Sequence, residues 1–145
     1  FLEFVCGIYN TGFSDIDEKL ELFELKAHAD ELIESYSHGM QQKLVLASIL
    51  IRKPKVILLD EPLVGLDPKS ARLVKSIYNE LSKNGTTIFL STHILEIAEK
   101  LCSRLAIINK GKIIALGTLD ELKKHAASES DLEDVFFKLI ENNAD

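Results

Sequence analysis

The sequence lacks the features that would place the chain in a membrane or on a nucleic acid by itself. No apolar run among its 145 residues approaches the roughly 18 that span a bilayer, so a membrane role has to come through a partner. The net charge of -6 gives no basis for binding nucleic acid or anionic lipid. There is no signal-peptide pattern, and the chain begins at Phe1 rather than Met, which suggests an excised segment.

Cysteine is also scarce, which argues against a fold held by disulfides. The two cysteines, Cys6 and Cys102, lie far apart in apolar surroundings, and we expect both to be reduced core residues of a cytosolic protein. The composition is 46% hydrophobic and 28% charged, as in a soluble globular protein. The length suffices for one domain with its own hydrophobic core.

The first third of the sequence predicts helices. Phe1–Tyr9 is apolar enough for a buried helix end, which Asn10–Gly12 breaks. Ser14 or Asp15 is expected to cap a second helix. Residues Met40–Arg52 carry apolar side chains around more than one face, so we expect a helix that is buried on more than one side.

A strand–helix–strand unit is predicted in the middle of the chain. Val56–Leu59 is a continuous apolar run, typical of a parallel strand that is covered on both faces. Asp67–Pro68 is a helix start, with Asp as the cap and Pro in the first turn. Thr86–Ser91 is a second apolar, β-branched strand. This spacing predicts parallel strands joined by a right-handed crossover.

The last third predicts a hairpin and two capped helices. Lys110–Gly111 separates two short apolar runs, as in a two-residue hairpin turn. Thr118-x-x-Glu121 and Ser130-x-x-Glu133 both match the capping box that opens a helix.

Two carboxylates, Asp60 and Glu61, directly follow the first predicted strand. Ligands of open α/β sheets sit at the carboxyl ends of the strands, and burying paired charges there is costly. A Mg²⁺ ion held by Asp60 beside phosphates would explain the pair, with Glu61 as the general base that polarises the attacking water. The alternative is a strand that ends in a solvated acidic loop, and the pair alone does not decide between the two.

The second predicted strand ends in Ser91-Thr92-His93, so the same sheet edge receives a histidine. His93 is suited to contact a γ-phosphate or to stabilise charge that develops during its transfer. A single histidine at a strand end is more often an ordinary partly buried residue. Its combination with Asp60 and Glu61 favours the functional interpretation.

Ser37 and Gly39 stand immediately before the predicted helix at Met40. A hydroxyl and free backbone N–H groups at a positive helix end are suited to bind phosphate. The alternative is plain N-capping by Ser37.

In this order, the motifs resemble those of ABC ATPases over essentially the whole chain. Tyr36–Met40 is similar to the ABC signature motif, commonly Leu-Ser-Gly-Gly-Gln. Val56–Glu61 resembles the Walker B strand, Gly65–Asp67 the D-loop, and His93 the H-loop. Leu132–Phe136 resembles the tail of many ATPases that drive ABC-2-type exporters.

The resemblance implies an α/β chain with a partial P-loop NTPase (ABC ATPase) fold: parallel strands with flanking helices, part of the helical subdomain and a C-terminal hairpin. Residues 1–52 would be part of the helical subdomain with the signature helix, and residues 53–145 the C-terminal part of the RecA-like core. The full-length subunit would be an ATP hydrolase that couples ATP, bound with Mg²⁺, to transmembrane transport in the direction of export.

In the family, two subunits sandwich two ATP molecules head to tail. By resemblance, Asp60 would hold the metal ion, and Glu61 and His93 would be the catalytic residues for the subunit's own ATP. His38 and Met40 depart from the commonest signature pattern, and a side chain at position 38 would narrow the approach to the partner's ATP. The residues expected to contact the partner's ATP or to reach across the dimer are Ser37, His38, Gly39, Met40 and Asp67.

The sequence departs from the family in the nucleotide-binding motifs. The P-loop pattern Gly-x-x-x-x-Gly-Lys-Ser/Thr is absent, because the only Gly-Lys pair, Gly111–Lys112, lacks the earlier glycine and is followed by Ile113. The Q-loop glutamine is absent too, since Gln41 and Gln42 lie in the signature helix. Because the P-loop supplies most of the phosphate grip, we expect the 145-residue chain alone neither to bind ATP tightly nor to hydrolyse it.

The expected partners are a second ATPase subunit and transmembrane permease subunits, which would hold the protein at the cytoplasmic face of the cell membrane. No nucleic acid is expected, and exposed strand edges would favour self-association of the chain. Two alternatives stay open: the C-terminal lobe of an SMC- or Rad50-type ATPase, and a non-catalytic interaction module. The transporter-like Glu61–Pro68 segment and the absence of heptads weigh against the first, and the intact Glu61 and His93 weigh against the second.

Overall fold

A computed structural model describes residues 1–128 and 130–142. The chain divides into two compact units, Phe1–Leu90 and Ser91–Asp145, each built around buried apolar side chains. None of the helices in the described residues has the length and apolar character that crossing a membrane requires. The predicted boundary at residue 52 concerns the subdomains of an ABC ATPase and stays a prediction.

Helices fill the first half of the first unit. Helix α1 closes at Asn10, whose left-handed φ of 52° lets its N–H donate to the carbonyl of Cys6. Two single-turn 3₁₀ helices lie between α2 and the long helix α3. In order, these elements are α1 (Leu2–Tyr9), α2 (Ile16–Leu22), the 3₁₀ helices Lys26–His28 and Ile33–Ser35, and α3 (His38–Ile51).

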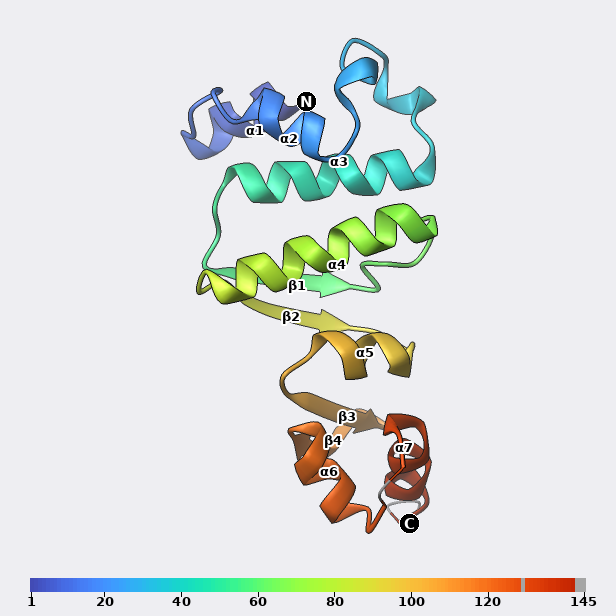
Figure 1. The fold of residues 1–145 in the computed structure, drawn as a ribbon. Helices are drawn as coiled ribbons and strands as arrows, with labels where there is room; N and C mark the ends of the chain where they lie inside the picture. The colour runs from blue at the N-terminus through green and yellow to red at the C-terminus, as the bar shows by residue number, and fades with distance from the viewer. Residues whose placement is uncertain (129, 143–145) are drawn as a thin grey trace. The chain divides into compact units, whose positions relative to one another are not determined.

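A strand–helix–strand segment completes the first unit: β1 (Val56–Asp60), α4 (Pro68–Lys83) and β2 (Thr87–Ser91). The two strands are neighbours in one sheet and run in the same direction (Figure 1), which confirms the predicted parallel pair. Helix α4 begins where the sequence predicts, because Asp67 accepts hydrogen bonds from the backbone N–H groups of Lys69 and Ser70, both at 3.0 Å.

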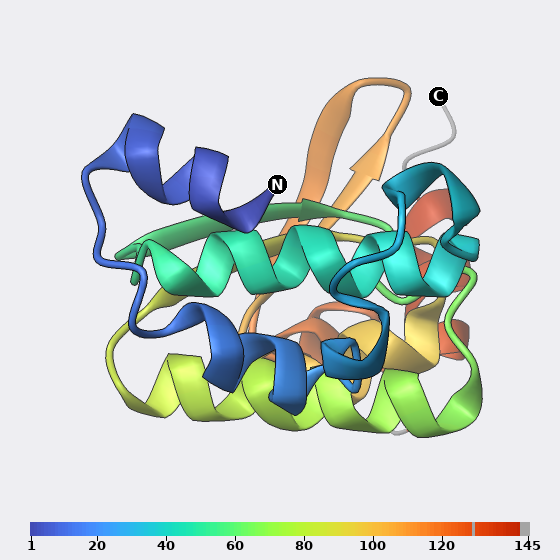
Figure 2. The same ribbon diagram turned by 90° about the horizontal axis from the view of Figure 1, so that it is seen from above.

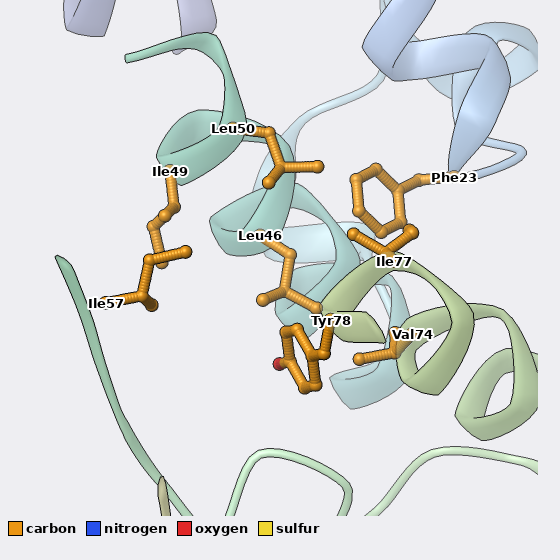
Figure 3. A pocket seen from close by; sticks show the side chains of 8 residues that line it. All are labelled: Phe23, Leu46, Ile49, Leu50, Ile57, Val74, Ile77 and Tyr78. Carbon is orange, nitrogen blue, oxygen red and sulfur yellow. The ribbon is translucent and has the colours of Figure 1, made fainter. Parts of the chain in front are cut away.

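The core of the first unit lies where α3 and α4 meet the inner face of β1. Figure 3 shows the side chains that converge there around a small apolar cavity. Val74, Ile77 and Tyr78 form the buried side of α4, and α3 is buried on more than one side, as its apolar pattern indicates. The lining residues are Phe23, Leu46, Ile49, Leu50, Ile57, Val74, Ile77 and Tyr78.

The prediction that β1 is covered on both faces is wrong. Its side chains alternate: Ile57 is buried, whereas Val56 and Leu58 are 54% and 76% exposed. Phe89 of β2 is likewise 62% exposed. Successive side chains of a strand point to opposite faces, and only one face of this sheet packs on helices. The other face presents apolar side chains to solvent.

Helix α1 is also less buried than its composition suggests. Val5 and Cys6 are buried, whereas Phe4 and Ile8 are exposed, so only one side of the helix contributes to the core. At its end, the guanidinium carbon of Arg52 lies 4.5 Å from the centre of the Tyr9 ring, a cation–π contact between α1 and the end of α3. Cys6 and Cys102 are both free thiols, as predicted.

The second unit combines helices with an antiparallel hairpin. Lys110 and Gly111 both have positive φ, 49° and 77°, as the predicted two-residue hairpin turn requires. Its elements are α5 (Leu95–Leu101), β3 (Leu105–Asn109), β4 (Lys112–Gly117), α6 (Leu119–His125) and α7 (Leu132–Glu141). Its buried core consists of Leu105, Ile107, Ala115, Leu122, Ala126, Leu132, Val135 and Leu139.

One of the two predicted capping boxes is confirmed and the other is wrong. Thr118 accepts from the N–H of Glu121 at 3.3 Å, and the Glu121 carboxylate accepts from the N–H of Thr118 at 2.8 Å. Helix α7 is instead capped by Asp131, which accepts from the N–H of Asp134 at 3.1 Å. Aspartate caps as well as serine does, so the helix starts one residue later than the Ser130 pattern predicts.

Candidate phosphate site in the first unit

Most of the residues selected from the sequence lie at one end of the first unit, whereas His93 lies in the second unit. Helices α3 and α4 begin at this end of the first unit and strand β1 ends there, as the two views in Figures 1 and 2 agree. Ser37 precedes α3, Asp60 ends β1, and Asp67 precedes α4. The start of α3 is a positive helix end suited to phosphate, whereas the start of α4 is occupied by the carboxylate of its cap Asp67. Asp60, at the end of β1, is suited to a cation beside phosphate.

Ser37 is the N-cap of α3. Its hydroxyl accepts from the backbone N–H of Met40 at 3.3 Å, so the capping role that the sequence left open is real. Ser37 and His38 are exposed, and Gly39 and Met40 are partly buried. The first N–H groups of a helix have no partner within the helix, so an exposed start of this kind can still bind an anion.

Glu61 has a backbone conformation that residues other than glycine rarely adopt. Its φ is 45°, a left-handed value that costs on the order of 1–3 kcal/mol and is concentrated at functional sites. The N–H of Val64 donates to the carbonyl of Glu61 at 3.2 Å, which closes a turn at the end of β1. Positive φ also occurs at Asn10 and Lys53. The strain at Glu61 therefore supports a functional role for this residue but does not establish it.

Asp67 holds the start of α4 with both of its carboxylate oxygens. Besides the two backbone bonds to Oδ1, Oδ2 accepts from the hydroxyl of Ser70 at 2.5 Å. The hydroxyl and backbone N–H of Ser70 hold the pKa of Asp67 below its usual value. The structural role of Asp67 is thus an N-cap, and a role across a dimer stays a prediction.

A contact that the sequence interpretation missed joins α3 to the loop after β1. The Nε2 of Gln42 donates to the carbonyl of Val64 at 2.7 Å, and the His38 ring packs on Gly65. Gly65 was the available signal, since a loop glycine often marks a positive φ or a close approach. Here it marks both, with a φ of 82°.

His93 belongs to the second unit and lies between β2 and α5. It is exposed, and the hydroxyl of the preceding Thr92 accepts from the N–H of Ile94 at 3.1 Å, which turns the chain toward α5. Joint action of His93 with Asp60 and Glu61 stays a prediction.

The metal assignment rests on Asp60. In the part of the chain that the structure describes, no three His, Cys, Asp or Glu side chains form a group able to hold a metal ion by themselves. Mg²⁺ beside phosphates is usually held by one or two carboxylates, with water and phosphate oxygens as the other ligands. An exposed carboxylate at the end of β1 fits that partial role.

Comparison with known proteins places these features in a family. The family model described as "AAA domain, putative AbiEii toxin, Type IV TA system" matches residues 9–99, and it represents a P-loop ATPase domain. The chain belongs to the ABC-type P-loop ATPases. In P-loop ATPases a strand-end aspartate helps to hold the Mg²⁺ beside the phosphates, and Asp60 is at the end of β1.

Its sequence relatives are ATP-binding proteins of ABC transporters. The chain is 41% identical over 122 residues to a fluoroquinolones export ATP-binding protein of Mycobacterium tuberculosis. It is 41% identical over 113 residues to a daunorubicin resistance ATP-binding protein of Streptomyces coeruleorubidus, and 35% identical over 139 residues to the ABC transporter ATP-binding protein YthP of Bacillus subtilis. It spans 40%, 36% and 59% of these relatives, which cover 84%, 78% and 94% of this chain.

Solved structures agree on the fold. An ATP-binding subunit of an ABC transporter superposes with a TM-score of 0.88 at 28% identity, over 95% of this chain and 60% of that one. An ATP-binding cassette of an ABC transporter in its ADP conformation superposes with a TM-score of 0.64 at 26% identity, over 85% of this chain and 48% of that one. The partial ABC ATPase fold implied by the sequence motifs is therefore confirmed.

Proposed function

We propose that this chain forms the C-terminal part of an ABC transporter ATPase that couples ATP hydrolysis to export. The observation that carries the proposal is the convergence of the starts of α3 and α4 with the end of β1 at one end of the first unit. The relatives whose names specify fluoroquinolone export or daunorubicin resistance favour export as the direction. The relatives are transporter proteins, which gives no support to an SMC-type lobe or to a non-catalytic module.

Each candidate residue has a chemical task in the proposal. Glu61 orients the attacking water and accepts its proton, and His93 stabilises charge on the γ-phosphate. Bound Mg²⁺, held by Asp60, would neutralise charge on the phosphates. The start of α3, at Ser37 and Gly39, binds the γ-phosphate of ATP held by a second subunit.

The residues flanking this helix start have smaller parts. His38 and Met40 would extend the same surface, and Asp67 would reach across the dimer to the partner subunit. We propose that the partners are this second ATPase subunit and transmembrane permease subunits, at the cytoplasmic face of the membrane. Self-association of the chain through the exposed apolar face of its β1–β2 sheet also stays a prediction.

The chain as it stands is expected to be inactive. Its 145 residues contain no P-loop pattern, and the backbone cradle and lysine of that loop provide most of the grip on the triphosphate. Isothermal titration of the chain with Mg²⁺ and ATP should therefore show no tight binding. Steady turnover of ATP that Glu61→Gln abolishes would contradict this expectation.

The catalytic assignment is tested in a fusion in which this chain replaces the segment of YthP that it matches. We expect the fusion to hydrolyse ATP, and Glu61→Gln to lower kcat by at least about a hundredfold while nucleotide binding is retained. Glu80→Gln, at an exposed position of α4, is the matched control and should leave kcat unchanged. Hydrolysis by the Glu61→Gln fusion near the unmodified rate would exclude Glu61 as the base.

A further inference from the structure

The start of α3 and the loop after β1 are joined by specific contacts, although they are far apart in the sequence. The Nε2 of Gln42, one turn into α3, donates to the carbonyl of Val64 at 2.7 Å. One turn earlier, a methyl group at Gly39 would lie 3.7 Å from the carbonyl oxygen of Gly65 and 3.9 Å from Cδ2 of Leu66. The first turns of α3 therefore lie directly on the loop.

The tightest of these contacts belongs to His38. A Cβ atom at Gly65 would lie only 2.6 Å from Cδ2 and 3.0 Å from Nε2 of the His38 ring, closer than side chains can approach. In this position the ring fills the space beside Gly65, and a side chain at position 65 would require the ring to move. At Gly39 the corresponding distances are ordinary van der Waals contacts, so the ring of His38 makes the closer approach to the loop.

The loop needs this support because its middle is exposed. Its two ends are fixed by the left-handed backbone of Glu61 and by the capping bonds of Asp67. Between them, Val64 and Gly65 are exposed, so the interior of the protein does not hold them. Contacts from α3 hold this part of the loop, together with the buried side chain of Leu63 and the bond from the N–H of Val64 to the carbonyl of Glu61.

We propose that His38 is a positioning residue for the proposed ATP hydrolysis. Its imidazole packs on the backbone of Gly65 and holds the 61–67 loop against the start of α3. The helix start with Ser37 and the loop with Glu61 are thereby kept in one geometry. The inference rests on the proposed function for its consequence, but the contact itself is independent of it. It also changes the expected role of His38, from a ligand of the partner's ATP to a support for the loop.

The contact is tested first on the 145-residue chain by amide hydrogen exchange, which needs no nucleotide. The N–H groups of Val64 and Leu66 donate within the loop, at 3.2 and 3.4 Å, and report its opening. We expect His38→Ala to speed their exchange about tenfold, because the ring that holds the loop is gone. His38→Phe keeps a flat ring and should leave exchange close to that of the unmodified chain. Equal exchange in the unmodified and His38→Ala chains would overturn the proposal.

A pair of glycine substitutions provides the matched control. Gly65→Ala should open the loop strongly, and His38→Ala should relieve part of that effect in the double variant, because the clash with the ring disappears while the positive φ remains. Gly39→Ala, which meets only ordinary contacts, should leave exchange at Val64 and Leu66 unchanged. Additive effects of the substitutions at positions 38 and 65 would contradict a direct contact.

The YthP fusion then separates positioning from nucleotide contact. A positioning role predicts that His38→Ala lowers kcat about tenfold with little change in KM, and that His38→Phe restores the rate. Equal losses in the Ala and Phe variants would mean that the imidazole acts on the nucleotide, which overturns the positioning role and leaves the proposed function intact. If no fusion hydrolyses ATP, the proposed function fails, and the exchange data alone decide the contact.

Discussion

The two compact units differ in how closely their local structure follows the usual rules of hydrogen bonding and packing. The second unit has a regular hairpin turn, a complete capping box at Thr118 and a contiguous core around Val135. Among the described residues, the buried polar side-chain atoms without a hydrogen-bond partner all lie in the first unit, at Thr11, Gln42, Arg52 and Tyr78, and Glu61 there has a left-handed backbone. Departures from local rules tend to collect where a protein functions. The comparison therefore directs attention to the first unit, where most of the candidate residues lie.

The largest expected effect tests the packing difference between the units. Leu122 is 2% exposed in the second core, so Leu122→Ala should lower the unfolding free energy of that unit by about 2–5 kcal/mol. Leu58 lies on the exposed face of β1, and Leu58→Ala should change stability by less than about 0.5 kcal/mol. Urea unfolding combined with hydrogen exchange measures both. A large loss from Leu58→Ala would mean that the outer sheet face is covered in solution.

The second prediction concerns the strained backbone of Glu61. Alanine usually gives a more stable protein than glycine, because glycine increases the freedom of the unfolded chain. At a φ of 45° the order should reverse, with Glu61→Gly more stable than Glu61→Ala by about 1 kcal/mol. Asn84, at a φ of -87°, is the control position, where the usual order should hold. Urea midpoints of the four variants decide, and the usual order at both positions would rule out strain at Glu61.

The third prediction compares two buried tyrosines of the first unit. The hydroxyl of Tyr78 is buried without a partner among the described residues, and burial raises its pKa. Tyr78→Phe should therefore stabilise the chain by about 1 kcal/mol. The hydroxyl of Tyr36 donates to the carbonyl of His28 at 2.7 Å, so Tyr36→Phe should destabilise by about 1 kcal/mol. Thermal unfolding that shows the same sign for both substitutions would contradict this difference.

The smallest effect is the acid sensitivity of the helix caps, one in each unit. Ser70 lowers the pKa of Asp67, and the backbone N–H of Thr118 lowers that of Glu121. A lowered folded-state pKa gives stability that is present above the unfolded value and lost as pH falls through the folded one. Asp67→Asn and Glu121→Gln should each flatten the fall of Tm between about pH 5 and pH 2. Differential scanning calorimetry measures the slope, and an unchanged slope would mean that neither cap contributes to it.

Much of the fold could be predicted from the sequence because it is coded locally. Asp67 before Pro68, Lys110–Gly111 and the Thr118 capping box each act within a few residues, and each is confirmed. The predictions that failed depended on competition between neighbouring residues for one role, or on packing between segments that are far apart in the sequence. Asp131, and not Ser130, caps α7, because either of these neighbouring residues could serve as the N-cap.

The candidate site could also be predicted only in part from the sequence. The candidate residues from Ser37 to His93 could be identified from their order and spacing in the sequence. They fall at strand ends and helix starts, where α/β units commonly bind their ligands. The strain at Glu61 could not be foreseen, since any residue type can be held in that backbone conformation if its surroundings determine it. The bond from Gln42 to Val64 and the packing of His38 on Gly65 join segments more than twenty residues apart, and no local pattern encodes them.

The sequence by itself determined the class of fold, the helix and strand starts, and the identity of the candidate residues, because each follows from short-range chemistry. The tertiary structure decided which face of β1 is covered, what the side chain at position 38 touches, and why position 65 is glycine. Those outcomes depend on how α3, α4 and β1 pack together, and packing is set by the shapes of side chains that meet only after the chain has folded.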